Sequence, residues 1–189
     1  MVTVRNRRLQ FGAVVLAAAA TAGLLTQLGL GGSDKVQIGN GSVSALAHAS
    51  RTADSLPQSV LDYPFAERNF ASPNGGGSRL LQVQGSLRLY GVPGKGGLMC
   101  LVEVDAAAET AGGACADHSV LRTGSIYMAD LQEDGSRQVV GLVGDGHTYA
   151  EANGRRAPVQ NNAFVLNHVE GGDLTVGSPT ASQHVDIGG

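Results

Sequence analysis

Alternating apolar and polar positions begin near residue 79 and continue through most of the second half of the chain. In residues 80–91 the aliphatic residues Leu81, Val83, Leu87 and Leu89 share one parity, and the other parity is polar or aromatic from Gln82 to Tyr90. A period of two places alternate side chains on opposite faces of a strand, so this segment predicts one buried face and one solvated face. Gly85 is expected to form a bulge within it. The almost wholly apolar run LMCLVEV at 98–104 predicts a strand buried on both faces.

Further short apolar runs lie between turn sequences, at 126–131, 138–143, 147–152, 155–159, 163–169 and 174–176. Asn153-Gly154 is a strong two-residue hairpin signal, and the segment 133–136 (EDGS) predicts a second hairpin. About eight short strands joined by short turns are typical of a small antiparallel β-sandwich or barrel. We therefore expect a mainly β domain over residues 79–176, with a short helical turn at 117–122 and a disordered tail over 177–189.

The segment that precedes this domain, residues 34–78, has the composition of a linker. Residues 43–55 carry Ala and Leu at loosely helical spacing, so a short helix is expected there. Prolines then interrupt any long element, and 72–78 (SPNGGGS) predicts a flexible hinge. Apolar side chains between 56 and 65 suffice to dock on a neighbouring domain, so a docked segment and a free tether both stay open.

The N-terminus combines a basic lead with an apolar run. Residues 1–8 contain three arginines, and residues 9–33 contain no charged residue. The apolar stretch 9–30 has 22 residues, and roughly 20 span the hydrocarbon core of a bilayer. This pattern predicts a retained transmembrane helix, with residues 1–8 in the cytoplasm and the rest of the chain extracytoplasmic. The alternatives are a secretory signal cleaved near Ala20-Thr21-Ala22, which would give a secreted protein, and a buried helix of a soluble protein.

The net charge and the aromatic content disfavour two classes of ligand. Residues 34–189 carry ten basic and sixteen acidic residues, and this net charge of −6 disfavours nucleic-acid binding. The chain has no Trp, four Tyr and four Phe, so stacking platforms for sugars or bases are not expected. Its 28 glycines are expected to reflect many short connections and flexible ends.

Only two cysteines are present, Cys100 and Cys115, and both lie in the part expected to be exported. An even count in an oxidising compartment predicts one disulfide. A catalytic thiol or a metal pair fits less well, because the sequence has no CxxC and no nearby His at the usual ligand spacing.

Three segments resemble a pattern found in uncharacterised exported proteins of actinobacteria. They are VPGKGGLMCL at 92–101, GGACA at 112–116, and the region from VGLVGDGH at 140–147 to Asn153-Gly154 and PVQNNAF at 158–164. The resemblance covers residues 79–169, and the chain departs from it at Gly144, where Pro is expected, and at His147, where an aliphatic residue is usual. It implies a secreted, disulfide-bonded β-domain and implies no activity.

The candidate chemistry centres on Asp145 and His147, with His118 and His168 available elsewhere. Imidazoles and a carboxylate could hold Zn²⁺ or Cu²⁺, but no HxH or HxxxH pair exists in residues 79–176, so folding would have to assemble the site. The simpler interpretation is an Asp-Gly turn followed by a surface His. We therefore assign no catalytic, cofactor or metal residue from the sequence.

Two other groups of residues give weaker evidence of a catalytic site. The consecutive Asp117-His118-Ser119 cannot form a triad, since neighbouring side chains point in different directions. Asp130, Glu133 and Asp134 cluster at an expected hairpin tip, where they would be solvated and not paired across a cleft. We expect a membrane-tethered, non-enzymatic β-domain with an envelope protein as partner and no cofactor. The alternative is an exported hydrolase or metal-dependent enzyme with a site near Asp145 and His147.

Overall fold

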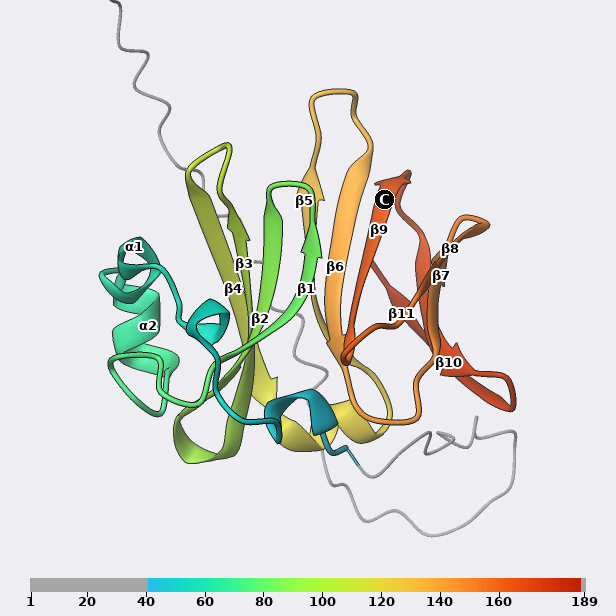
Figure 1. Cartoon of the computed structure of the whole chain (residues 1–189). Coiled ribbons are helices and arrows are strands. Elements are labelled where there is room, and N and C mark those ends of the chain that lie inside the picture. Colours follow the sequence, from blue (N-terminus) through green and yellow to red (C-terminus); the bar gives the residue numbers. More distant parts are fainter. Residues whose placement is uncertain (1–40, 188–189) are drawn as a thin grey trace, which may run out of the picture.

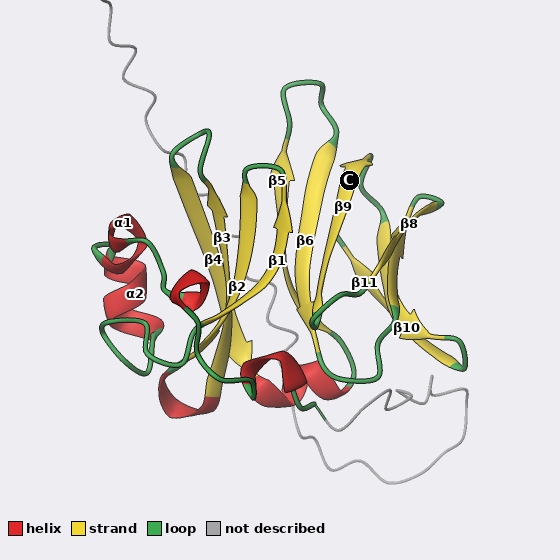
Figure 2. Ribbon diagram, viewed as in Figure 1, coloured by secondary structure: helices red, strands yellow, loops and turns green. Residues whose placement is uncertain are grey.

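The computed structural model describes residues 41–187, and the strands in this part of the chain form three antiparallel sheets (Figures 1 and 2). The first sheet has the order β1-β2-β3-β4, the second β5-β6-β9 and the third β11-β10-β7-β8. The strands are β1 (Arg79–Gln84), β2 (Leu87–Pro93), β3 (Leu98–Asp105), β4 (Thr110–Asp117), β5 (Ser125–Leu131), β6 (Arg137–Val143), β7 (Tyr149–Ala152), β8 (Arg155–Pro158), β9 (Ala163–Val169), β10 (Asp173–Ser178) and β11 (Ala181–Asp186). The helices are η1 (Ser44–Leu46), η2 (Thr52–Asp54), α1 (Gln58–Leu61), α2 (Pro64–Asn69), η3 (Lys95–Gly97) and η4 (His118–Arg122).

The expected mainly β, antiparallel class is confirmed. The N-terminal helix expected over 9–33 lies outside the described residues. Within residues 41–187, no helix has both the length and the apolar character needed to cross a membrane.

The sheets stack as layers, and α1 and α2 form a further layer on the outer face of the first sheet (Figure 1). The first and second sheets enclose one hydrophobic core, and the second and third sheets enclose another. The middle strand β6 contributes to both, because Val140 and Leu142 enter the first core while Val139 and Val143 enter the second. Period-two geometry thus explains why β6 has no polar side chain from Val139 to Val143.

The edges of the stacked sheets lie against one another. β4 lies beside β5, and β1 lies beside β9, where the Asn161 side-chain amide donates to the Leu81 carbonyl at 3.0 Å. The first two sheets therefore form a flattened barrel, which we call the inter-sheet barrel. On the other side, the Tyr127 hydroxyl of β5 donates to the Asp186 carbonyl of β11 at 3.3 Å. Covering edges in this way limits pairing with other chains.

The inter-sheet barrel has two different ends. At the closed end, η1 and η4 fill the opening, and Val43 and Leu121 are buried in the barrel core. The opposite end, here called the hairpin end, is bounded by the β1–β2, β3–β4 and β5–β6 hairpins (Figure 1). The described chain begins at the closed end, with η1 drawn in blue at the bottom of Figure 1.

Residues 41–78, which we call the strap, pack on the barrel instead of hanging free. Leu56, Val60 and Phe70 are buried against the outer face of the first sheet. The buried Asp54 accepts hydrogen bonds from the backbone amides of Arg51 at 2.7 Å and of Leu80 at 2.9 Å, which fixes η2 to the start of β1. The docked arrangement is therefore the one found.

Three expectations about the strands were wrong. Residues 80–91 form a hairpin and not one strand, because Gly85 adopts a positive φ of 61° and turns the chain. A register shift between Leu80 and Gln82 changes the parity of β1, so Val83 is 56% exposed. Tyr90, expected at the surface, is buried because the strap covers its face of β2.

The expectation of a disordered tail from residue 177 was also wrong for the residues described up to 187, because β10 continues to Ser178 and β11 pairs with it along its whole length. Residues 110–117, for which no strand was predicted, form β4, and all eight of its residues pair with β3.

The predicted disulfide is confirmed. Cys100 on β3 and Cys115 on β4 lie directly opposite each other and are bonded, on the face covered by the strap. Gly113 on the same strand leaves the space that the Phe65 ring of α2 occupies, since a Cβ atom there would lie 2.5 Å from that ring. The small residues of β4 therefore serve close packing and do not provide flexibility.

Candidate functional site

Asp145 fastens the strap to the barrel. Its Oδ1 accepts a hydrogen bond from the Ser44 backbone amide at 3.0 Å and another from the Asn162 side-chain amide at 2.8 Å. Asn162 Oδ1 in turn accepts from the Ala45 backbone amide at 3.0 Å. Burial raises the pKa of Asp145, but the hydrogen bonds from Asn162 and Ser44 outweigh it and lower that pKa below its ordinary value. We call this network the strap clasp, and its role is structural.

His147 is buried and does not share a partner with Asp145. Its Nδ1 lies 2.9 Å from the Gly144 carbonyl, to which it donates, and its Nε2 is buried without a hydrogen-bond partner among the described residues. Only 6% of the residue is exposed. Burial lowers the pKa of this imidazole, partly offset by the Gly144 hydrogen bond. The interpretation of His147 as a surface residue was therefore wrong.

The other histidines do not complete a site with these two residues. Asp117 Oδ1 accepts the Ser119 amide at 2.8 Å and thereby caps η4, where His118 is the first residue. His168 contacts Asp134 and Ser136 on a different hairpin. Over residues 41–187 no group of three or more His, Cys, Asp or Glu side chains is placed to hold a metal ion.

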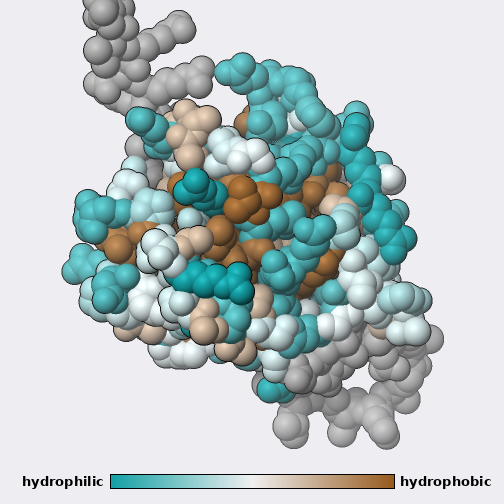
Figure 3. Space-filling view, viewed as in Figure 1, coloured by the Kyte–Doolittle hydropathy of each residue, from teal (hydrophilic) through white to brown (hydrophobic). Residues whose placement is uncertain are grey.

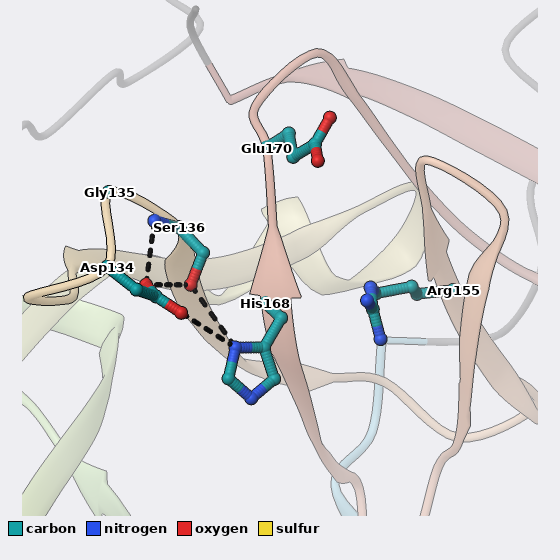
Figure 4. Close-up of a pocket in the computed structure, with 6 residues that line it drawn as sticks. All are labelled: Asp134, Gly135, Ser136, Arg155, His168 and Glu170. Carbon is teal, nitrogen blue, oxygen red and sulfur yellow. Dashed lines mark hydrogen bonds and ion pairs between the residues drawn. The ribbon is translucent and has the colours of Figure 1, made fainter.

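A shallow polar hollow lies at the hairpin end, between the β5–β6 hairpin, the end of β9 and the start of β8 (Figure 4). We call it the hairpin hollow, and its lining residues are Asp134, Gly135, Ser136, Arg155, His168 and Glu170. Asp134 Oδ2 lies 3.2 Å from His168 Nδ1, and the Ser136 hydroxyl donates to Asp134 Oδ1 at 2.6 Å. The hydrogen bonds from the Ser136 hydroxyl and amide lower the pKa of Asp134, with a smaller effect from His168.

A β-bulge in β9 directs His168 toward this hollow. Arg137 of β6 pairs with Val169 and Val139 pairs with Leu166, so two residues of β9 face one residue of β6. His168 takes a φ of +55° at this point, a left-handed conformation that is uncommon for a non-glycine residue. As a result, its ring lies beside Asp134 and Ser136, with Arg155 on the other side of it (Figure 4).

The hollow offers polar groups to a ligand but lacks the geometry of a nucleophilic triad. In a triad the serine and the carboxylate bond opposite nitrogens of the imidazole. Here Ser136 and Asp134 both meet Nδ1 of His168, and the Ser136 hydroxyl also donates to Asp134. The His168 and Asp134 side chains are 63% and 54% exposed, so their contact is weakly stabilising. The arrangement suits reversible polar contacts.

The residue that the sequence reasoning missed is Glu103. Its carboxyl group, on β3, is hydrogen-bonded to Asp130 on β5, and the two form a carboxyl pair across the inter-sheet barrel. Burial, then the charge and hydrogen bond of Asp130, and finally Asp105 raise the pKa of Glu103 to about 8. The alternation of side chains along β3 could have identified Glu103, because it shares the parity of Met99 and Leu101, which point into the barrel.

Several aromatic and basic side chains have structural roles. Tyr90 and Phe164 are buried in cores. Tyr149 lies under the Arg156 guanidinium, whose carbon is 3.8 Å from the ring centre. Lys95 donates to the Glu67 carbonyl at 2.6 Å, which holds the turn before β3 against α2.

The face shown in Figure 3 is mixed in character. Hydrophobic residues show between hydrophilic ones near its middle, while the hairpin end at the top is hydrophilic (Figure 3). The hairpin hollow thus lies at the polar end of the molecule, opposite η1.

Comparisons with family models, with curated proteins and with solved structures found no match to this chain.

Proposed function

We propose that this chain is an exported, membrane-tethered β-domain that acts as a non-enzymatic binding module of the cell envelope. The observation that carries the proposal is the polarity of the fold. The described chain enters at the closed end, and the hairpin hollow lies at the opposite end (Figure 1). A domain tethered through residues preceding the strap would present the hollow away from the membrane.

The rest of the fold is suited to act as a rigid scaffold for the hairpin hollow. The strap clasp, Asp54 and the Cys100–Cys115 disulfide fix the strap and the first sheet. The hollow is built from hairpins on this scaffold, and binding residues are commonly carried by loops that a rigid scaffold positions. Its mixture of Arg155 with Asp134 and Glu170 favours an envelope partner bearing both charges. The competing proposal of an enzyme at Asp145 and His147 has no support, because these two residues bond to different groups.

Two measurements test the proposal. The first determines the localisation of the protein by cell fractionation and the redox state of its cysteines by thiol alkylation in intact cells. We expect the chain in the membrane fraction with Cys100 and Cys115 oxidised. A chain found in the cytosolic fraction with reduced thiols contradicts the export half of the proposal.

The second measurement is site-specific photo-crosslinking in intact cells. A photoreactive residue at Arg155 should give an adduct that is lost when His168→Ala is added, since this variant removes the ring from the hollow. A photoreactive residue at Ser119, exposed on η4 at the closed end, is the matched control and should give no such adduct. Equal adducts at both positions, or none at Arg155, would contradict a binding role for the hollow.

A further inference from the structure

The carboxyl pair joins the first and second sheets near the hairpin end. Glu103 lies in β3 between Leu89 of β2 and Gly112 of β4. Asp130 lies in β5 opposite Gln138 of β6. The hydrogen bond between the two carboxyl groups therefore connects strands that belong to different sheets.

The surroundings of Glu103 oppose its ionisation. One of its carboxyl oxygens, Oε2, is buried and has no hydrogen-bond partner among the described residues. Gly112, the neighbour on β4, brings no polar side chain, and the sulfur of Met128 lies close to this glycine. Glu103 is half-buried and Asp130 is exposed, so the desolvation falls mainly on the Glu103 carboxyl group. Burying one oxygen of a carboxylate is unfavourable, and a second carboxylate within hydrogen-bonding distance makes it more so.

Among residues 41–187, the charged groups recorded as acting on Glu103 include no cation. The charged groups that act on Glu103 are Asp130 from β5 and Asp105 from its own strand, and both are acidic. The strands that flank β3 place Leu89 and Gly112 beside it, and neither is charged. The proton on Glu103, which it donates to Asp130, is thus the feature that keeps the two carboxyl groups in contact.

We propose that the Glu103–Asp130 pair is a pH-sensitive latch, which holds the two sheets together at the hairpin end while Glu103 retains its proton and releases them when Glu103 is ionised. Below pH 8 the protonated Glu103 donates to the Asp130 carboxylate. As the pH rises through about 8, Glu103 loses this proton to solvent, and the two carboxylates repel. The β3–β4 and β5–β6 hairpins then separate and admit water to that end of the barrel core. The direction agrees with proton linkage, since a carboxyl pKa raised by folding makes stability fall as the pH rises toward that pKa.

The test uses the full-length chain and two readouts. The first is a ¹³C NMR titration of labelled glutamate carboxyls, in which one signal should titrate near pH 8 and vanish in Glu103→Gln. The second is hydrogen–deuterium exchange of β3 and β5 at pH 6 and pH 9, corrected for the intrinsic exchange rate. Because ionisation rises about tenfold per pH unit below the midpoint, protection of these strands should fall between the two pH values.

The variants separate a latch from general alkaline loosening. Glu103→Gln keeps a hydrogen-bond donor but cannot ionise, so β3 and β5 should stay protected at pH 9. Asp130→Asn removes the partner charge and should lower the Glu103 midpoint and abolish the pH-dependent opening. Glu109→Gln, the same change at an exposed residue of the β3–β4 turn, should behave as the wild type. A wild type without a glutamate that titrates near pH 8, or an equal loss of protection in Glu103→Gln, would overturn the latch.

Discussion

Gly141 tests the stacked-sheet architecture most directly. It lies in the middle of β6, the central strand of the central sheet, directly opposite Phe164 of β9. A Cβ atom at this position would lie 2.2 Å from two ring carbons of Phe164. Phe164 is fully buried between the second and third sheets, so its ring has no free space to enter.

The change Gly141→Ala should therefore overpack the second core. Extra methyl groups in a well-packed core cost about 1–3 kcal/mol, and the fixed Phe164 ring places this case toward the upper end of that range. For a domain of this size each kcal/mol lowers the Tm by roughly 2–4 °C. The chain has no Trp, so urea and thermal unfolding should be followed by far-UV circular dichroism.

Two further variants isolate the cause. Gly112→Ala places the same methyl group in another strand, where the nearest atom is the Met128 sulfur at 3.6 Å, an ordinary contact distance. This control should lose no stability. Phe164→Leu should be less harmful in the Gly141→Ala background than in the wild type, because the smaller side chain relieves the clash. If Gly141→Ala costs no more than Gly112→Ala and shows no coupling to Phe164→Leu, the packing argument is refuted.

Three other predictions concern single contacts. Folding lowers the pKa of His147 below its ordinary value of 6.5, so the buried neutral imidazole contributes fully to folding stability above pH 6.5 and this contribution is lost as the pH falls below 6.5. The variant His147→Gln should therefore flatten the pH dependence of the free energy of unfolding between pH 6.5 and 5, measured by urea unfolding. Replacing Cys100 and Cys115 together by Ala should cost about 3 kcal/mol in the chain-entropy model for a loop of roughly this length, and a reductant should then have no additional effect on the unfolding midpoint. Asp145→Ala should open the strap clasp, cost about 1–3 kcal/mol and raise hydrogen exchange in η1 more than in α2; equal exchange in both helices would contradict the clasp.

Turn chemistry explains why the hairpins could be predicted from the sequence. Asn153 and Gly154 adopt positive φ values of 50° and 71°, the backbone geometry that a two-residue hairpin turn demands. Gly135 takes a φ of 82° in the β5–β6 hairpin. These constraints are local, so a few residues specify them. Gly85 was harder, because a glycine within an alternating segment is compatible with a bulge or a turn, and only pairing of β1 with β2 decides between them.

The candidate sites depend on contacts between segments that are distant in the sequence. Only some of their residues could therefore be predicted from the sequence. Glu103 could have been identified as a charged residue at an inward position of β3. Its partner Asp130 could not, because that pairing depends on how the first sheet packs on the second. The hairpin hollow was hidden for a similar reason, since the β9 bulge that orients His168 toward Asp134 arises from the register of β9 on β6.

The glycines link these observations to the fold. Several were expected to mark flexible connections, yet Gly91, Gly113 and Gly141 lie inside strands. A Cβ atom on them would come within 3.1 Å or less of Leu46, Phe65 or Phe164, respectively. Phe65 and Phe164 belong to the neighbouring layer or strand that covers the glycine, and Leu46 belongs to η1 at the closed end of the barrel. A chain that stacks helices and three sheets must bury strands on both faces, and glycine allows a large side chain to lie directly on the backbone. The high glycine content therefore reflects close packing between layers as well as turns. A prediction based on alternation, which assumes one buried face for each strand, gives too few layers for this reason.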